Sequence, residues 1–353
     1  MLKLWLAAAV FAVSAAQGAF AQAAAPLTRI AFGSCADQDK PQPVWDAVLA
    51  YKPELFIFAG DNVYGDKTDG RTASNPPGPV ASLRDSYERV KQVAGFMQAK
   101  NTLRHLAIWD DHDYGSNDGG GDFAGKHQSK QLFLDFWNIP DSDARRSREG
   151  LYHSEIIGPR GKSVQVILLD TRFFRSALKR NPAGPSDLGR YIPDDDPAKT
   201  MLGPAQWAWL AEELRKPAEI RLIVSSVQVL ADNHGWERWG NFPLEQQKLF
   251  DTIRASQADG VVFLSGDRHI GGLYRDARGA PYRQAEITSS GLTEAWANSP
   301  EASSNIVGGL YGAVNFGSID IDWRERKVTL SLRNMTGERV RQLSIGFDEL
   351  KAP

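Results

Sequence analysis

Short, nearly continuous apolar runs recur along the chain, and they predict buried strands. The runs at 55–59, 163–169 and 260–265 are apolar at almost every position, which is typical of strands that are buried on both faces. In all, the pattern predicts strands at 28–33, 55–59, 105–109, 163–169, 220–225, 260–265, 282–289, 313–321, 326–334 and 339–346.

Longer segments with apolar residues at helical spacing lie between the earlier strands. They predict helices at 41–51, 82–99, 126–137, 204–215 and 243–256. Pro204 supports the prediction of the helix at 204–215, because proline is favoured in the first turn of a helix. Two long segments rich in Gly, Pro and Asp, 65–81 and 175–203, interrupt the pattern and are expected to be functional lids or flexible surface.

The order of these elements changes along the chain. Strands alternate with helices at first, whereas consecutive strands joined by turns follow from residue 282 onward. This order suggests one mixed sheet, or two sheets packed face to face with helices outside. No internal repeat or low-complexity linker divides the chain, so we expect a single domain over 24–353.

The N-terminal residues predict an export signal. Met1–Lys3 is positively charged, Leu4–Phe20 is apolar and rich in alanine, and Ala21–Ala23 has the small residues typical of a cleavage site. A retained membrane anchor needs roughly 20 strongly apolar residues, and this stretch is shorter and interrupted by polar residues. We therefore expect residues 1–23 to be removed, and the remaining protein to be soluble, without a membrane span, and periplasmic or secreted.

Composition narrows the function further. The 41 Lys and Arg residues nearly balance the 43 Asp and Glu residues, so the strongly basic character of nucleic-acid-binding proteins is missing and no stable nucleic-acid complex is expected. Cys35 is the single cysteine and cannot form an intrachain disulfide. An unpaired thiol in an oxidising compartment has to be buried or occupied, and a bound metal ion would occupy it.

Several predicted strands end in residues that can bind metal ions. These endings are Cys35, GDNVY at 60–64, DDHDYGSND at 110–118 and GDRH at 266–269. Taken singly, each is explained as a tight turn or a solvated acidic loop. Together they indicate one site, because carboxylates gathered at strand ends repel one another unless a cation neutralises them.

The donor atoms in these loops suit two different cations. Thiolate, phenolate, carboxylate and imidazole donors on one ion suit Fe(III), whereas a neighbouring site made of oxygen donors suits Ca²⁺ or Mg²⁺ better than Zn²⁺. Two cations about 3.5–4 Å apart, bridged by a carboxylate, are the usual arrangement for hydrolysing phosphate esters.

The ordered motifs resemble a known family. FGSC, GDNVY, WDDHD with Asn117, LDTR at 169–172, SSVQ at 225–228 and GDRH are similar to those of the PhoD-like alkaline phosphatases and phosphodiesterases. These enzymes are calcineurin-like metallophosphoesterases related to purple acid phosphatases. The resemblance implies an α+β/α/β fold, a four-layer αββα metallophosphoesterase sandwich. It also implies a dinuclear Fe(III)/Ca²⁺ site whose metal-bound hydroxide attacks the phosphorus of a small-molecule phosphate ester.

The resemblance assigns the iron ligands residue by residue. Cys35 takes the place of the first aspartate of ordinary metallophosphoesterases and would ligate Fe(III) together with Tyr64 and His269. Asp61 would bridge the two metals.

The same resemblance assigns the ligands of the second metal and the catalytic residues. Asp111 or Asn117, together with Asp267, would hold Ca²⁺, with Mg²⁺, Mn²⁺ or Zn²⁺ as alternatives. His112 would donate a proton or contact the transition state near the leaving oxygen. Arg172 matches an arginine of the family and would either contact a phosphate oxygen as a planar donor or form a salt bridge.

Residues outside the ligand motifs allow less specific predictions. His234, Trp236 and Trp239 follow the strand at 220–225, where they either line the substrate cleft or pack beneath a loop. The cationic side chains expected to form a solvated face are Arg175, Lys179 and Arg180.

Three other functions stay open at this level. A phosphodiesterase or a phospholipase would use the same site as a phosphomonoesterase. A metal-free hydrolase would use Cys35 as nucleophile with a histidine base, but it would leave Asp61, Tyr64 and Asp267 without a role. A non-catalytic metal-binding protein of the cell envelope would keep the ligands without turnover. The oligomeric state is not predicted.

Overall fold

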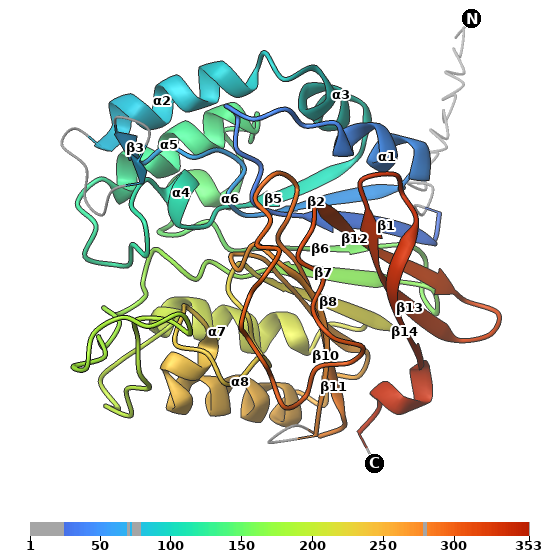
Figure 1. Ribbon diagram of the computed structural model, residues 1–353. Helices are drawn as coiled ribbons and strands as arrows, with labels where there is room; N and C mark the ends of the chain where they lie inside the picture. Colours follow the sequence, from blue (N-terminus) through green and yellow to red (C-terminus); the bar gives the residue numbers. More distant parts are fainter. Residues whose placement is uncertain (1–24, 69–70, 73–78, 278–280, 353) are drawn as a thin grey trace, which may run out of the picture.

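Two six-stranded sheets lie face to face, and helices cover the outer side of each (Figure 1). The computed structural model describes residues 25–68, 71–72, 79–277 and 281–352. The predicted leader, 1–23, lies outside the described residues, and part of the segment 65–81 does too. The predicted arrangement of two packed sheets with helices outside is confirmed.

The first sheet joins parallel strands from the N-terminal part to an antiparallel meander from the C-terminal part. Its strands, in spatial order, are β14 (Arg339–Gly346), β13 (Lys327–Asn334), β12 (Asn315–Asp322), β1 (Arg29–Gly33), β2 (Leu55–Ala59) and β5 (His105–Ile108). Strands β1, β2 and β5 are parallel, with Gly33 paired to Phe58 and Ala59 paired to Ile108. Because these strands stop at the same edge, the loops that follow them emerge side by side.

The second sheet is parallel at its centre and antiparallel at both edges. Its strands, in spatial order, are β10 (Gly271–Asp276), β11 (Gln284–Ser289), β9 (Val261–Ser265), β8 (Ile220–Ser225), β7 (Val164–Leu168) and β6 (His153–Ile157). Strands β7, β8, β9 and β11 run parallel. Every residue of β7, β8 and β9 is buried, which agrees with their apolar sequences. A separate hairpin consists of β3 (Lys67–Thr68) and β4 (Arg71–Thr72).

Helices form the two outer layers. Those over the first sheet are α1 (Val44–Tyr51), α2 (Pro79–Val90), α3 (Ala94–Thr102) and α5 (Lys126–Phe136), and those over the second sheet are α7 (Gly203–Leu214) and α8 (Pro243–Ala255) (Figure 1). Shorter turns of helix are α4 (Asp111–Tyr114), α6 (Ala144–Ser147), η1 (Trp239–Asn241) and η2 (Phe347–Leu350). None of the helices in the described ranges combines the length and apolar character needed to cross a bilayer.

Aromatic side chains fill the space between the first sheet and its helices. The Trp45 ring on α1 lies 5.3 Å from the Phe56 ring and 5.4 Å from the Phe96 ring, centroid to centroid. All three side chains are fully buried, and burying each such side chain contributes about 1.5–3 kcal/mol relative to leaving it exposed. This packing fixes the strands whose ends carry the polar loops.

Some predicted elements are wrong in detail. The helix expected over 82–99 is two helices, because the chain turns at 91–93 and α3 restarts so that Gly95 packs directly on the Trp45 side chain. The strand expected at 282–289 pairs with β9 and β10 in the second sheet and is not part of the meander. Strands β6 and β10 were missed, because one is a partly exposed edge strand and the other begins with two glycines.

Candidate metal centre

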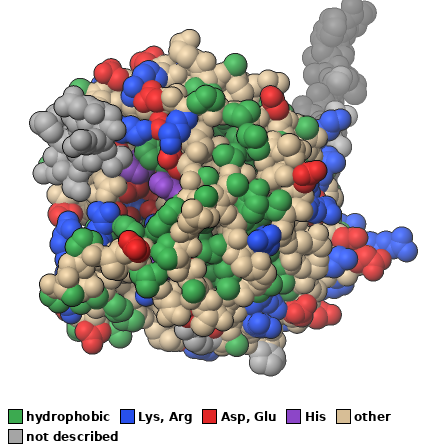
Figure 2. All heavy atoms as spheres, viewed as in Figure 1, with side chains coloured by type: hydrophobic (Ala, Val, Ile, Leu, Met, Phe, Trp, Pro, Cys, Tyr) green, Lys and Arg blue, Asp and Glu red, His purple; other side chains and the backbone are tan. Residues whose placement is uncertain are grey.

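Loops that follow four different strands meet where the two sheets lie together. Cys35 follows β1, Asp61 follows β2, Asp111 follows β5, and Asp267 and His269 follow β9. Figure 2 shows histidine side chains at the bottom of a hollow on this face of the molecule. The strand ends therefore bring together the residues that the sequence singled out.

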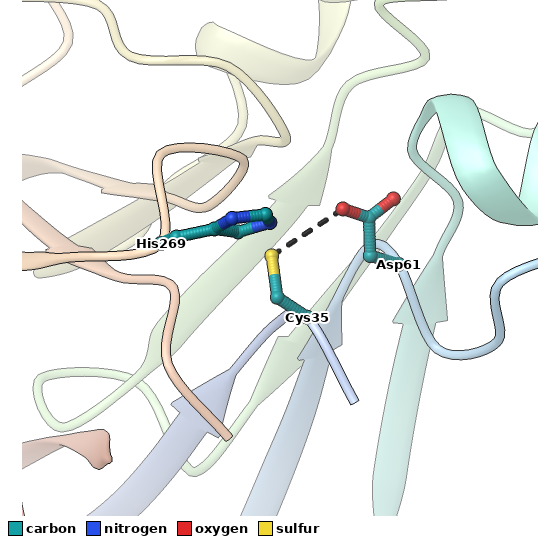
Figure 3. A group of neighbouring side chains, drawn as sticks. All are labelled: Cys35, Asp61 and His269. Atoms are coloured by element: carbon teal, nitrogen blue, oxygen red, sulfur yellow. Dashed lines mark hydrogen bonds between the residues drawn. The ribbon is translucent and has the colours of Figure 1, made fainter. Parts of the chain in front are cut away.

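The first group of donors consists of Cys35, Asp61 and His269. Their ligand atoms all lie within 4.8 Å of one another, and the side chains point toward a common centre (Figure 3). Sγ of Cys35 lies 3.3 Å from Oδ2 of Asp61. Oη of Tyr64 lies 3.2 Å from Nε2 of His269, so the phenol extends the same group. The four predicted iron ligands are thus adjacent.

A second group of donors shares Asp61 with the first. Ligand atoms of Asp61, Asp111 and His112 lie within 4.8 Å of one another, and so do those of Asp110, Asp111 and Asp267. The two carboxylate oxygens of Asp61 face different partners, since Oδ2 lies against Cys35 while Oδ1 accepts the backbone N–H of His112 at 3.2 Å. A carboxylate placed in this way can bridge two cations.

Several of these residues adopt an unfavourable backbone conformation. The φ angles are 64° for Cys35, 47° for Asp61, 69° for Asp267, 57° for His269 and 55° for Asp118. Residues other than glycine rarely occupy this left-handed region, which costs about 1 kcal/mol or more for each, and they do so most often at functional sites. The loops are therefore shaped to direct these side chains inward.

The buried carboxylate of Asp113 holds two of the loops together. Its Oδ1 accepts the backbone N–H groups of Asp61 at 3.2 Å and Asp110 at 2.5 Å, and its Oδ2 accepts that of Asn62 at 3.2 Å. Burial raises the pKa of Asp113 to about 7. Asp113 thus holds the loops after β2 and β5 in place through their backbone N–H groups.

The charges of the site are those of a cation-binding site. Burial, together with neighbouring carboxylates, raises the pKa of Asp61 and of Asp267 well above the ordinary range. Burial also raises the pKa of Asp110 to about 7 and that of the Cys35 thiol well above its usual value. Two buried oxygens, Oδ2 of Asp110 and Oδ1 of Asp111, have no hydrogen-bond partner. Unpaired buried carboxylates are costly unless a cation compensates them, so these residues fit metal ions.

His112 belongs to the second group of donors, and its ring contacts Tyr64 of the first. Its ring stacks on the Tyr64 ring, with centroids 4.1 Å apart and an interplanar angle of 27°. Burial acts to lower the pKa of His112, but the carboxylates of Asp111, Asp61 and Asp66 raise it well above the usual value. The imidazole is consequently suited to carrying a proton.

Arg172 is part of a buried ionic network behind these groups. The side chain is fully buried, with Nε donating to Oδ1 of Asp110 at 2.6 Å and Nη1 donating to Oε1 of Glu237 at 2.8 Å. Its Nη2 lies 3.8 Å from Oδ1 of Asp111. These contacts favour the salt-bridge interpretation of Arg172, and direct contact with a phosphate oxygen stays a prediction.

The solvated position predicted for Arg175 is wrong. Arg175 is 2% exposed and its Nη2 lies 2.9 Å from Oε1 of Glu237, because Glu237 pairs with both buried arginines. The same prediction is confirmed for Lys179 and Arg180, which are exposed.

Asn117 lies beside the donor groups in the wall of a cavity of about 300 Å³. The neighbouring Asp118 donates its backbone N–H to Oδ2 of Asp111 at 2.7 Å, and ligand atoms of Asp111, Asp118 and Glu237 lie within 4.8 Å of one another. Asp111 is therefore placed among the donors by the geometry, while the choice between Asp111 and Asn117 as metal ligand stays a prediction.

The aromatic loop after β8 has mixed roles. His234 is buried and its Nε2 lies 3.0 Å from Oε1 of Gln228. Trp239 is fully buried and packs edge-on against Trp207 at 6.0 Å. His234 and Trp239 therefore pack beneath a loop, as one of the two predictions had it. Trp236 is only half-buried.

Three polar residues near the site were not identified from the sequence as contributors. Glu237 lies in a segment that is distant from the ligand motifs along the chain, Asp66 lies just outside the GDNVY motif, and Asp118 was counted only as one carboxylate of an acidic loop. The sequence did contain a signal for Asp66, since this residue is a carboxylate that follows GDNVY by two positions.

Comparison with known proteins agrees with this geometry. The family model described as "PhoD-like phosphatase" matches residues 30–304, which cover all of the donor groups. This chain belongs to the PhoD-like phosphatase family.

A curated relative agrees with the family assignment. Alkaline phosphatase D of Bacillus subtilis (strain 168) is 24% identical over 278 residues, which are 69% of this chain and 46% of the relative. The chain therefore spans about half the length of this curated relative.

Two solved structures share the fold. The structure of PhoD has a TM-score of 0.69 at 16% identity, covering 92% of this chain and 69% of that one. Purple acid phosphatase PPD1 from yellow lupin (Lupinus luteus) seeds has a TM-score of 0.57 at 8% identity, covering 91% of this chain and 54% of that one. The chain thus has the metallophosphoesterase sandwich expected from its sequence.

Proposed function

We propose that this chain is an exported, metal-dependent phosphoric-ester hydrolase with a dinuclear Fe(III)/Ca²⁺ centre, acting on small-molecule phosphate esters. The observation that carries the proposal is the sharing of Asp61 between two adjacent donor groups in a member of the PhoD-like phosphatase family. One group contains sulfur, nitrogen and phenol oxygen donors, and the other contains carboxylates.

The donor types support different metals in the two positions. Cys35, Tyr64 and His269 with Asp61 would hold Fe(III), since thiolate and phenolate are strongly donating anions. Asp111 or Asn117, together with Asp267 and the shared Asp61, would hold Ca²⁺, which prefers oxygen ligands. When bound, such a pair supplies charge neutralisation for the phosphoryl oxygens and lowers the pKa of water.

Residues of the chain perform the remaining tasks. His112 would donate a proton to the leaving oxygen, and its charge is supported by the carboxylates around it. Arg172 would neutralise Asp110 and Asp111 from behind and so set the charge of the site. The cavity bordered by Asn117 and Asp118 adjoins the donors, so it would receive the leaving group of the ester.

Aryl phosphate mono- and diesters test this proposal. The protein without residues 1–23 is assayed after loading with Fe(III) and Ca²⁺ and again after chelation. We expect turnover that chelation abolishes and that the two metals restore, and the ratio of mono- to diester turnover separates a phosphatase from a phosphodiesterase or phospholipase. Absence of turnover under every metal condition contradicts the proposal.

The competing cysteine-hydrolase hypothesis is tested in the same assay. Cys35 Sγ is fully buried, and burial and Asp61 raise its pKa, whereas a nucleophilic cysteine needs an accessible thiolate. That hypothesis predicts turnover that resists chelation and is lost on alkylation. Sequencing the N-terminus of the exported protein tests the predicted removal of 1–23.

A further inference from the structure

A separate cavity lies among helices α2, α3 and α5, on the outer side of the first sheet. Its volume is about 360 Å³, which is within the range of small-molecule sites. Its walls include the apolar parts of Met97, Leu132 and Phe136 and the polar side chains of Lys100 and Tyr87. None of the candidate metal ligands contributes to its lining.

Lys100 brings a buried positive charge to this cavity. The residue is 6% exposed, and its Nζ lies 5.1 Å from the centroid of the Phe136 ring and 5.8 Å from that of the Trp137 ring. In the part of the chain that the structure describes, no hydrogen bond or ion pair involves this ammonium. Contact with aromatic faces compensates a cation only partly, and buried charges are normally paired.

The carboxylates near the cavity already have other partners. Glu88 lies 2.6 Å from Nζ of Lys91, and Asp135 accepts a hydrogen bond from Arg146 at 2.6 Å. Burial and the positive charge of Lys91 both lower the pKa of Lys100. The charged side chains around the cavity therefore leave an excess of positive charge. This excess favours binding of an anion in the cavity.

Tyr87 contributes its ring, and not its hydroxyl, to the wall. Tyr87 is 3% exposed, and its oxygen is closed off from solvent. Its ring packs on the Phe136 ring at a centroid distance of 4.7 Å. Because Nζ of Lys100 also lies over the Phe136 ring, the ammonium borders an aromatic surface.

We propose that this cavity binds a small organic anion, a carboxylate or phosphonate attached to an apolar group. Lys100 serves as its counter-ion, and the apolar group lies against Phe136 and the ring of Tyr87. This site is distinct from the metal centre and does not depend on the proposed hydrolase function.

Benzoate is the probe, and benzyl alcohol is a neutral molecule of nearly the same shape. Binding to the full metal-loaded protein is measured by calorimetry and by ligand-observed NMR. The variant Lys100→Met keeps most of the apolar side chain and removes the charge, whereas Tyr87→Phe removes only a hydroxyl that is closed off from the cavity. Lys248→Met is the control, because Lys248 also lies over a ring, that of Trp207 at 4.6 Å, but is half exposed and paired with Glu245.

We expect benzoate to bind the wild type and Lys248→Met equally and benzyl alcohol to bind neither. Lys100→Met should weaken benzoate binding about tenfold or more, whereas Tyr87→Phe should leave it unchanged. Melting temperatures verify that the variants are folded, and turnover of phosphate esters should be unchanged in all of them. Benzoate binding that is absent in the wild type, or equal in wild type and Lys100→Met, overturns the proposal, as does equal binding of benzyl alcohol.

Discussion

Nδ1 of His112 lies 2.8 Å from Oδ1 of Asp66. Asp66 is fully buried and is located in the segment after β2, whereas His112 is located after β5. The carboxylate accepts a hydrogen bond from Nδ1–H. Nε2 is then the ring nitrogen that is left to interact with the substrate. A histidine–carboxylate pair of this kind sets both the orientation and the charge of the imidazole.

Replacing Asp66 by Asn should therefore impair turnover without removing the metals. The amide can still accept a hydrogen bond but no longer supports the positive charge of His112, so we expect kcat to fall about 10- to 100-fold with little change in KM. Kinetics on an aryl phosphate and metal analysis of the purified variant measure the two effects. Asp85→Asn, at an exposed position on α2, is the control. A variant with wild-type kcat would contradict the role of Asp66.

The sequence correctly indicated that these loops would lie together, because each one directly follows an apolar run. Cys35, Asp61, Asp111 and His269 follow strands whose burial is encoded locally, and the sheets then bring them together. The partners of these residues could not be predicted in the same way. Glu237 reaches the site from an irregular loop, and its pairing with Arg172 depends on packing between distant segments.

Replacing Cys35 by Ser should reduce iron binding and hydrolysis together. A serine hydroxyl is a weaker donor to Fe(III) than a thiolate, so we expect iron content to fall and activity to drop about tenfold or more. Metal analysis and the visible charge-transfer band of the purified protein report the iron. Ser34→Ala is the control, because Ser34 Oγ lies 3.3 Å from the same sulfur but is not a predicted ligand. Full iron content and colour in Cys35→Ser would show that the thiol does not bind iron.

Replacing Glu237 by Gln should destabilise the fold. Glu237 pairs with Arg172 and Arg175, both buried, and removing one partner of a buried ion pair typically costs about 3–5 kcal/mol. Chemical denaturation of the metal-free protein measures the free energy of unfolding, and Glu212→Gln on the exposed side of α7 is the control.

Arg172→Met distinguishes the two roles predicted for this arginine. A loss of stability similar to that of Glu237→Gln supports the buried network. A higher KM for aryl phosphate at unchanged stability would instead indicate that Arg172 contacts the phosphate.

The edge strand β6 provides a test of pH-dependent stability away from the metal centre. Nε2 of His153 lies 3.7 Å from Oε1 of Glu155, and Nη2 of Arg104 lies 2.7 Å from Oε2. The interactions with His153 and Arg104 outweigh burial and lower the pKa of Glu155 to about 2. The pKa of the unfolded state is higher, at about 4.3, so the contribution of Glu155 to stability is fully present above that pH. It is lost as the pH falls toward about 2. Because this side chain is 34% exposed, the contribution should be modest, about 0.5–1 kcal/mol.

Glu155→Gln should therefore be less stable than the wild type at pH 7, and the difference should shrink as the pH is lowered from about 5 to 3. Denaturant titrations at several pH values measure the free energy of unfolding of both proteins. Glu325→Gln, in the exposed turn between β12 and β13, is the matched control and should show no such convergence. A difference between Glu155→Gln and wild type that stays constant across this pH range would show that the carboxylate charge does not stabilise the strand.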